Sequence, residues 1–308
     1  MLLKRPSTMT ERENADAAMD HLTRTTPPMD LTVAAGLLCE AKEVFDGLGV
    51  AFFLRQGTCL GAIRDAAFIP WDDDIDIGSI VGMHGFNEDS IEPVADAFRA
   101  RGFHVRRDQF DGEIWLGIMK DNIRIDWLCL RIRQGHVLHF PGVRLPIRLF
   151  ENLKEINFIE TQFLVPDPPE EYLAIKYGAN WITPNRLDYG GEVIRNMPDG
   201  PSPGHPGRLK QRLLARLPGR STRLWVLDRD AVPIPGVKIT IAGWGAYSTN
   251  KEGYARFYLP QDDTFALIIE GKHQEEVLYE EQMAPGKTYV YRPDAEVSSG
   301  RIFILTAE

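Results

Sequence analysis

The sequence predicts an α+β protein in which a sheet with flanking helices is followed by a small all-β sandwich. Between residues 31 and 131, apolar residues recur first at helical spacing and then in alternating, strand-like runs. From residue 222 onward the pattern changes to short strands separated by turns that contain glycine or proline. A chain of 308 residues with 44% hydrophobic content can bury a sizeable core and is long enough for two domains.

The first part of the chain is predicted to be helical only in places. Residues 1–28 are polar and carry no sustained period, so they are expected to form a loose extension with one short helix around residues 11–24. The next apolar residues recur at helical spacing from Leu31 to Leu48, and Gly47 and Gly49 end this helix.

Strands dominate the segment that follows. Residues 50–54 read as a strand that leads into a Gly-Thr turn, and residues 91–101 as a helix that ends at Gly102. Successive antiparallel strands are predicted over residues 103–107, 114–120 and 123–131.

These patterns predict four parts of the chain. They are the extension (1–28), a catalytic domain (29–197), a linker with a short basic helix (198–221) and the sandwich (222–308). The linker is rich in proline and glycine, and its helix carries leucines near helical spacing. Residues 208–223 contain no acid, and two placements remain open for them: contact with an anionic membrane surface, or docking on the acidic catalytic domain.

The strongest chemical signal is a run of four aspartates within five residues, Asp72, Asp73, Asp74 and Asp76. If Ile75 and Ile77 lie on a buried strand face, the strand period puts the alternate acids on the opposite face, about 6–7 Å apart per step. Carboxylate oxygens at this spacing can converge on one hard cation such as Mg²⁺. A helix-loop-helix calcium loop is excluded, because its sixth and twelfth positions would be Ile77 and Met83 instead of Gly and Glu.

A Gly-Thr pair lies about fifteen residues upstream of the acids. Such a turn offers backbone N–H groups to a phosphate, although the pair alone is a weak signal. The complete run from Gln56 to Arg64, followed by the run from Phe68 to Gly78, resembles the signature of the LicD/fukutin family of phosphotransferases. A downstream stretch, residues 163–184, resembles the closing segment of that family, so the resemblance covers roughly residues 30–190.

The resemblance implies a nucleotidyltransferase-like mixed sheet and a metal-dependent transfer of a phospho-alcohol from a CDP-linked donor to a glycan or glycolipid, with release of CMP. The transferred group would be of the phosphocholine, ribitol phosphate or glycerol phosphate type. Asp74 and Asp76 would hold Mg²⁺ or Mn²⁺. A separate resemblance, over about residues 222–295, is to transthyretin-like, carboxypeptidase regulatory-type sandwiches; we expect a structural or glycan-positioning appendage.

Asp126 is the best candidate for a third carboxylate. It stands between apolar residues on a predicted buried strand, and nucleotidyltransferase folds take a third acid from a neighbouring strand. The alternatives are a strand aspartate in an ordinary hydrogen bond, or Asp121, whose position after Lys120 indicates simple turn chemistry. We expect Asp126 to bind metal and to accept the proton of the attacking hydroxyl.

Five further residues are candidates for substrate binding: Gly57, Thr58, Arg64, Trp71 and Asp72. Arg64 follows the Gly-rich segment and is either a bidentate phosphate ligand or a solvated helix residue. Trp71 either stacks on a base or fills the core. Two rival functions stay open: transfer of NMP from an NTP to a small acceptor, and a non-catalytic glycan-binding or assembly module.

Composition excludes some partners and indicates a compartment. A net charge of −9 argues against nucleic acid, since binding to a phosphate backbone needs a basic face. The chain has an odd number of cysteines, and all three lie in apolar surroundings: Cys39, Cys59 and Cys129. This pattern is typical of buried thiols in a protein of a reducing compartment. The N-terminus lacks the apolar stretch of a signal peptide and no run approaches transmembrane length, so we expect a cytoplasmic protein, either free or peripheral to the inner face of the membrane.

Overall fold

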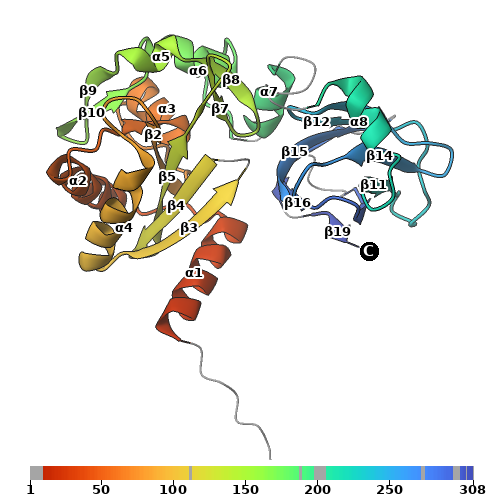
Figure 1. Cartoon of the computed structure of the whole chain (residues 1–308), viewed down its shortest axis with the longest axis horizontal. Helices are drawn as coiled ribbons and strands as arrows, with labels where there is room; N and C mark the ends of the chain where they lie inside the picture. The colour runs from red at the N-terminus through yellow and green to blue at the C-terminus, as the bar shows by residue number, and fades with distance from the viewer. Residues whose placement is uncertain are drawn as a thin grey trace, which may run out of the picture. The chain divides into compact units, whose positions relative to one another are not determined.

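The computed structural model describes residues 10–110, 113–186, 189–197, 206–271, 275–293, 299–302 and 304–307. The chain divides into two compact units, each built around its own sheets (Figure 1). Unit 1 comprises Met1–Arg131 and Arg148–Pro169, and unit 2 comprises Ile132–Ile147 and Glu170–Glu308. The predicted α+β class is confirmed.

Unit 1 is built on a five-stranded mixed sheet with the strand order β1-β2-β5-β4-β3. Its strands are β1 (Phe53–Leu54), β2 (Asp74–Ile80), β3 (His104–Phe110), β4 (Glu113–Lys120) and β5 (Ile123–Leu130). β2 and β5 are parallel, whereas the other neighbouring pairs are antiparallel. The predicted mixed sheet is therefore confirmed, and two strands distant in sequence become neighbours at its centre.

Short helices and one hairpin surround this sheet. They are α1 (Glu11–Thr25), α2 (Leu31–Gly47), α3 (Gln56–Arg64), η1 (Glu88–Ser90), α4 (Ile91–Ala100), α5 (Arg148–Glu151), and the hairpin of β9 (Lys154–Phe158) and β10 (Thr161–Val165). Asp30 begins α2 by accepting hydrogen bonds from the backbone N–H groups of Thr32 and Val33.

The apolar face of the sheet packs against α2 and α4. Phe45 of α2 lies edge-on to Trp127 of β5 and to Phe98 of α4, with ring centroids 4.9 and 5.7 Å apart. All three side chains are fully buried, as are Ile75 and Ile77 of β2. Because side chains alternate along a strand, the residues between these apolar positions lie on the opposite face.

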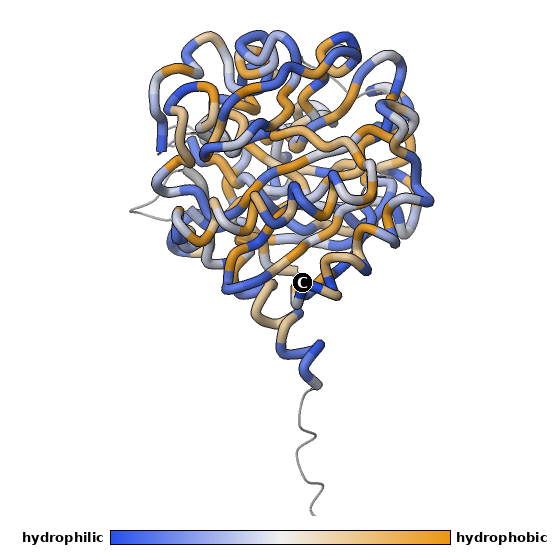
Figure 2. The backbone as a smooth tube through the Cα atoms, turned by 90° about the vertical axis from the view of Figure 1, so that its left-hand side faces the viewer, coloured by the Kyte–Doolittle hydropathy of each residue, from blue (hydrophilic) through white to orange (hydrophobic). Residues whose placement is uncertain are grey.

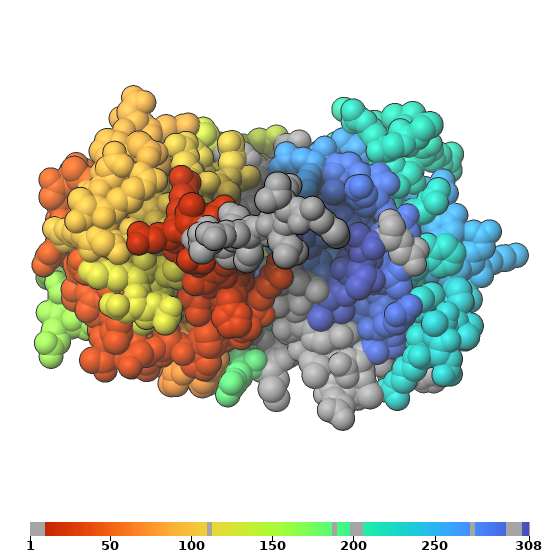
Figure 3. Space-filling model, turned by 90° about the horizontal axis from the view of Figure 1, so that it is seen from below, coloured from red at the N-terminus to blue at the C-terminus, as the bar shows by residue number. Residues whose placement is uncertain are grey.

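The short helix expected around residues 11–24 is present as α1, but it packs against that opposite face and is not part of a loose extension. A capping box of Thr10 and Glu13 begins the helix. Met19 is fully buried beside Gly117 of β4, and Asp16 pairs with His104 of β3 at 2.8 Å. The red residues of α1 lie against yellow residues of the sheet in Figure 3, while the first turns of the helix are polar and blue in Figure 2.

Unit 2 begins with a three-stranded sheet of order β6-β7-β8 and a set of helices. Their bounds are β6 (Ile132–Arg133), β7 (His136–His139), β8 (Val143–Pro146), α6 (Pro169–Tyr177), α7 (Tyr189–Arg195) and α8 (Arg208–Leu214).

The rest of unit 2 consists of two mainly antiparallel sheets, ordered β14-β11-β17-β19 and β13-β12-β15-β16-β18. The strands are β11 (Ser221–Val226), β12 (Lys238–Ile241), β13 (Gly245–Ser248), β14 (Tyr254–Tyr258), β15 (Asp263–Glu270), β16 (Glu275–Met283), β17 (Thr288–Tyr291), β18 (Ser299–Ile302) and β19 (Thr306–Ala307). One buried cluster takes side chains from both sheets, including Leu224, Phe257, Ile239 and Leu267. Two sheets that share a core are the arrangement expected of a sandwich; the transthyretin-like resemblance stays a prediction.

A second buried cluster joins α7 to these strands. Ile194 of α7 packs with Ala266 and Ile268 of β15 and with Val277 of β16. The expected domain boundary at residue 197 thus separates Ile194 from residues with which it shares a core. Among the residues placed in the structure, no helix has the length and apolar character needed to cross a membrane.

Candidate active site

The parallel pairing of β2 with β5 brings the predicted carboxylates together. Asp76 is the register partner of Asp126, and Asp74 is the partner of Arg124. Partners in register point to the same face of a sheet, so Asp74, Asp76 and Asp126 share the face opposite Ile75 and Ile77. The predicted alternation is confirmed for Asp74 and Asp76, but Asp72 precedes β2 and does not lie on the strand.

Asp76 is held by the segment that the sequence marks as a Gly-Thr turn. This segment is the first turn of α3, in which the backbone N–H of Gly57 donates to Asp76 Oδ2 at 3.2 Å. Thr58 Oγ1 accepts a hydrogen bond of 2.8 Å from the backbone N–H of Asp76. A carboxylate is stabilised at a helix N-terminus by the exposed N–H groups and the helix dipole. In this structure Gly57 therefore contacts the Asp76 carboxylate and Thr58 its backbone, and their predicted contact with a phosphate stays untested.

Two buried arginines neutralise the acids. Arg55 Nη2 lies 3.0 Å from Asp76 Oδ1, and the Arg55 residue is only 5% exposed. Arg124 Nη2 pairs with Asp74 Oδ2, and its Nε lies 2.8 Å from Asp126 Oδ1. Thr23 of α1 accepts a hydrogen bond from Arg124, so the N-terminal helix helps to orient this guanidinium.

Neither arginine is in the predicted site, although the sequence carries a signal for one of them. Arg124 precedes Asp126 by two residues and so must share its strand face. Arg55 stands alone at the end of a short strand, where a basic residue is most often solvated.

Asp126 has the electrostatics of a proton acceptor. Burial raises the pKa of its carboxyl to about 6; the Arg124 charge opposes this rise, and the Asp74 charge adds to it. A base whose pKa lies near neutral pH combines a large deprotonated fraction with useful basicity. The environment of Asp126 therefore suits the role expected of it.

This pKa predicts how the stability of the metal-free protein depends on pH. The folded state binds the Asp126 proton more tightly than the unfolded state, whose aspartates titrate near 3.9. Between about pH 4 and pH 6 the folded state therefore holds more protons, and the free energy of unfolding falls as pH rises, by about 1–3 kcal/mol in total. Urea unfolding with a chelator at pH 5, 6 and 7 measures this loss. Asp126→Asn is expected to lose less stability than the wild type over the same range, and equal losses would contradict the raised pKa.

Asp72 supplies the second set of possible metal ligands. Asp72, Asp73 and Asp74 each contribute one carboxylate oxygen to a group in which all three oxygens lie within 4.8 Å of one another. Asp72 Oδ2 is buried and makes no hydrogen bond among the described residues, and burial together with the neighbouring acids raises the pKa of this carboxyl well above its usual range. A divalent cation would supply the missing partner, and hard oxygen ligands fit Mg²⁺ or Mn²⁺. Asp74 belongs to both this trio and the predicted set of Asp74, Asp76 and Asp126.

Gly57 is a sensitive position because Asp72 lies directly against it. A Cβ atom at residue 57 would lie 2.5 Å from Asp72 Oδ2. Gly57→Ala is therefore expected to displace this carboxylate and to lower activity by about 10–10²-fold, while alanine stabilises the helix. Enzyme assays and thermal unfolding of Gly57→Ala measure the two effects separately. Gly36→Ala, which meets no atom within 4 Å in α2, is the control; equal activity of both variants would contradict a role for the Asp72 position.

Arg64 and Trp71 take no part in the acid cluster. Arg64 lies at the opposite end of α3 and pairs with Asp65 at 2.6 Å. Trp71 is half-buried in the loop before β2, and no described contact links it to a substrate site. Cys129 is buried, and this burial raises the pKa of its thiol, as expected for an inert core cysteine.

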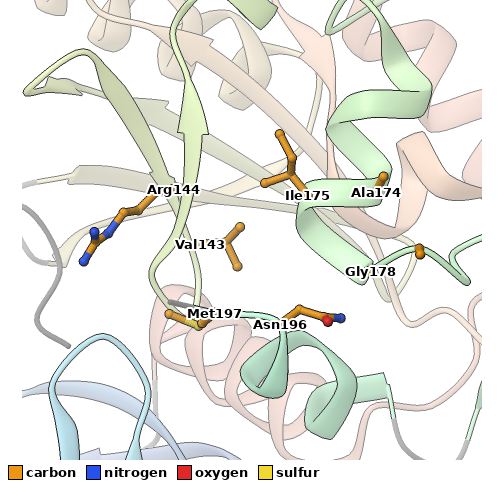
Figure 4. Close-up of a pocket in the computed structure, with 8 residues that line it drawn as sticks. Val143, Arg144, Ala174, Ile175, Gly178, Asn196 and Met197 are labelled. Carbon is orange, nitrogen blue, oxygen red and sulfur yellow. The ribbon is translucent and has the colours of Figure 1, made fainter. Parts of the chain in front are cut away.

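Unit 2 contains a separate cavity of about 340 Å³. Its lining includes Val143 of β8, Ile175 of α6 and Met197, together with Asn196 and Gly178 (Figure 4). The lining is largely apolar and contains no carboxylate. The lining also contains no histidine or cysteine, so the acids of unit 1 remain the candidate active site.

Comparison with known proteins finds similarity over the segment that contains these residues. Residues 49–167, which span β1 to the end of β10, match the family model described as LicD/FKTN/FKRP, nucleotidyltransferase domain. The match confirms the resemblance of this segment to the LicD/fukutin family.

Two of the relatives that match are named as ribitol phosphate transferases. Human ribitol-5-phosphate transferase FKTN is 25% identical over 160 residues, which cover 49% of this chain and 33% of that protein. Mouse ribitol 5-phosphate transferase FKRP is 26% identical over 191 residues, 58% of this chain and 35% of that protein. The chain thus matches about a third of the length of these relatives.

Proposed function

We propose that this protein is a metal-dependent phosphotransferase that moves a phospho-alcohol from a CDP-linked donor to a hydroxyl group of a glycan or glycolipid. The observation that carries the proposal is the pairing of Asp76 with Asp126 beside Asp74 on one strand face. The family match and the names of the relatives support the reaction class, and they favour ribitol phosphate as the transferred group.

Asp74 and Asp76 are the proposed metal ligands, with Asp126 as the third carboxylate and Asp72 as its nearest alternative. When bound, Mg²⁺ or Mn²⁺ neutralises charge on the donor diphosphate and on the leaving group. Arg55 and Arg124 hold the carboxylates in place: each is at least nine-tenths buried and lies within 3.0 Å of a site oxygen. α3 orients Asp76 through Gly57 and Thr58.

In the proposed reaction, the acceptor oxygen attacks the phosphorus that carries the alcohol. A new P–O bond forms to the acceptor, and the bond between this phosphorus and the bridging oxygen of CMP breaks. Asp126 takes the proton of the attacking hydroxyl, and CMP leaves with the electron pair of the broken bond. The product is a phosphodiester between the alcohol and the glycan.

A donor panel tests the proposal. The full chain with Mg²⁺ or Mn²⁺ is incubated with CDP-ribitol, CDP-glycerol or CDP-choline, with and without acceptor glycans, and CMP is measured. We expect CMP to appear with at least one donor and to depend on Asp76. No CMP from any donor, or equal release by Asp76→Asn, would contradict the proposal.

The same measurements separate the two rival functions. A nucleotidyltransferase would release pyrophosphate from an NTP, because it transfers the nucleotide itself. A non-catalytic glycan-binding module would release neither CMP nor pyrophosphate. The retention of every acid of the motif, together with the raised pKa of Asp126, favours an enzyme.

We further propose that the reaction takes place in the cytoplasm. The buried, raised-pKa thiol of Cys129 and the odd number of cysteines suit a reducing compartment. Fractionation of cells that express the tagged protein tests the location.

A further inference from the structure

The segment that contains α8 presents cations and leucines together on its outer side. Five basic residues of this segment are exposed: Arg208, Lys210, Arg212, Arg216 and Arg220. Among the residues that the structure describes, none of the five forms an ion pair, and the sequence has no acid between Gly200 and Leu227. The segment is therefore a local concentration of positive charge in a chain whose net charge is −9.

Three leucines are exposed in the same segment. Leu209 is 75% exposed, Leu213 is 58% exposed and Leu217 is 47% exposed. The leucines are four residues apart, and helical hydrogen bonds extend past α8 as far as Leu217, so they form one stripe. We call these leucines and the five cations the basic leucine patch.

The other side of the segment explains why the stripe stays outside. Gln211 is buried and accepts a hydrogen bond of 2.9 Å from the Tyr247 hydroxyl, and Ala215 is buried in the main cluster of unit 2. These two residues lie one helical turn apart and fix the helix on the strands of unit 2. The helix therefore docks on the strands of unit 2, and not on the acidic catalytic domain as one of the two placements expected. Its other side remains exposed, as the membrane placement requires (Figure 1).

We propose that the basic leucine patch binds the surface of a membrane that contains anionic phospholipids. Exposed leucines favour transfer into the boundary between headgroups and acyl chains, and the surrounding cations attract anionic headgroups. An anionic bilayer satisfies both kinds of side chain at once. A nucleic acid would pair with the cations but would leave the leucines in water. This inference is independent of the proposed reaction.

Sedimentation of the full chain with lipid vesicles tests the inference. Vesicles of phosphatidylcholine alone are compared with vesicles of phosphatidylcholine and phosphatidylglycerol. We expect binding to the mixed vesicles that weakens as salt is added, and little binding to the neutral ones. Two triple variants should each bind the mixed vesicles at least about tenfold more weakly than the wild type. They are the leucine variant (Leu209→Ser, Leu213→Ser, Leu217→Ser) and the charge variant (Arg208→Gln, Arg212→Gln, Arg216→Gln).

The control variant replaces three exposed apolar residues elsewhere, Leu48, Ile132 and Val232, by serine, and it should bind as the wild type does. Failure of the wild type to bind mixed vesicles, equal binding to neutral vesicles, or wild-type binding by the leucine variant would each overturn the inference. Circular dichroism and thermal unfolding check that the variants fold. If a triple variant unfolds, the single variant Leu209→Ser is tested in its place by the same vesicle sedimentation.

Discussion

Asp76→Asn is expected to lower the rate of phospho-alcohol transfer by about 10²–10³-fold or more, while the protein stays folded. Asparagine keeps the size of the side chain and one oxygen beside the Gly57 N–H, but it removes the charge that a metal ligand supplies. Alanine is a poorer probe at this position. It would leave the buried Arg55 without its carboxylate, and the loss of one partner of a buried ion pair costs about 3–5 kcal/mol of stability.

Turnover and thermal unfolding of Asp76→Asn are measured beside Asp65→Asn, which changes an acid that pairs with Arg64 outside the cluster. Near-normal turnover in Asp76→Asn would remove Asp76 from the site. Chelation should mimic the variant, and added Mg²⁺ or Mn²⁺ should restore only the wild type.

Asp74→Ala should behave in the same way, and it tests the metal assignment without leaving Arg124 unpaired, since Asp126 remains beside it.

The sequence predicts the elements around the site because their signals are local. The period of two in β2 separates Ile75 and Ile77 from Asp74 and Asp76, and the structure has this alternation. The helix over residues 31–47 and the three antiparallel strands that follow are also recovered, with boundaries that shift by a few residues. Spacing within one element was sufficient for all of these.

The residues missed by sequence reasoning depend on contacts between distant segments. Arg55 reaches Asp76 through the pairing of β1 with β2, and Arg124 reaches Asp74 through the pairing of β2 with β5. The sequence alone shows only that Arg124 shares a strand face with Asp126. The short helix expected around residues 11–24 is present as α1, but its packing on the sheet could not be predicted, because only Met19 is fully buried and the other contacts to the sheet are polar. The Gly-Thr pair is predicted to form a turn, and it forms the first turn of helix α3. The Asp76 carboxylate lies at the N-terminus of this helix.

Asp126→Asn is expected to slow the chemical step by about 10²–10⁴-fold even at saturating metal, if Asp126 accepts the proton of the attacking hydroxyl. An amide keeps an oxygen ligand and the shape of the side chain, but it cannot take up a proton at a useful pKa. If Asp126 only binds metal, the same substitution should weaken metal binding, and high metal concentration should restore the rate.

Single-turnover rates at increasing Mg²⁺ separate these two roles, since they report chemistry without product release. Asp121→Asn is the matched control, because Asp121 is an exposed acid in the neighbouring turn and its positive φ of 53° tolerates asparagine. A wild-type single-turnover rate together with unchanged metal affinity in Asp126→Asn would remove Asp126 from the site. Asp72 would then be the third carboxylate, because one of its oxygens already lies within 4.8 Å of ligand oxygens of Asp73 and Asp74 and its buried Oδ2 makes no hydrogen bond among the described residues.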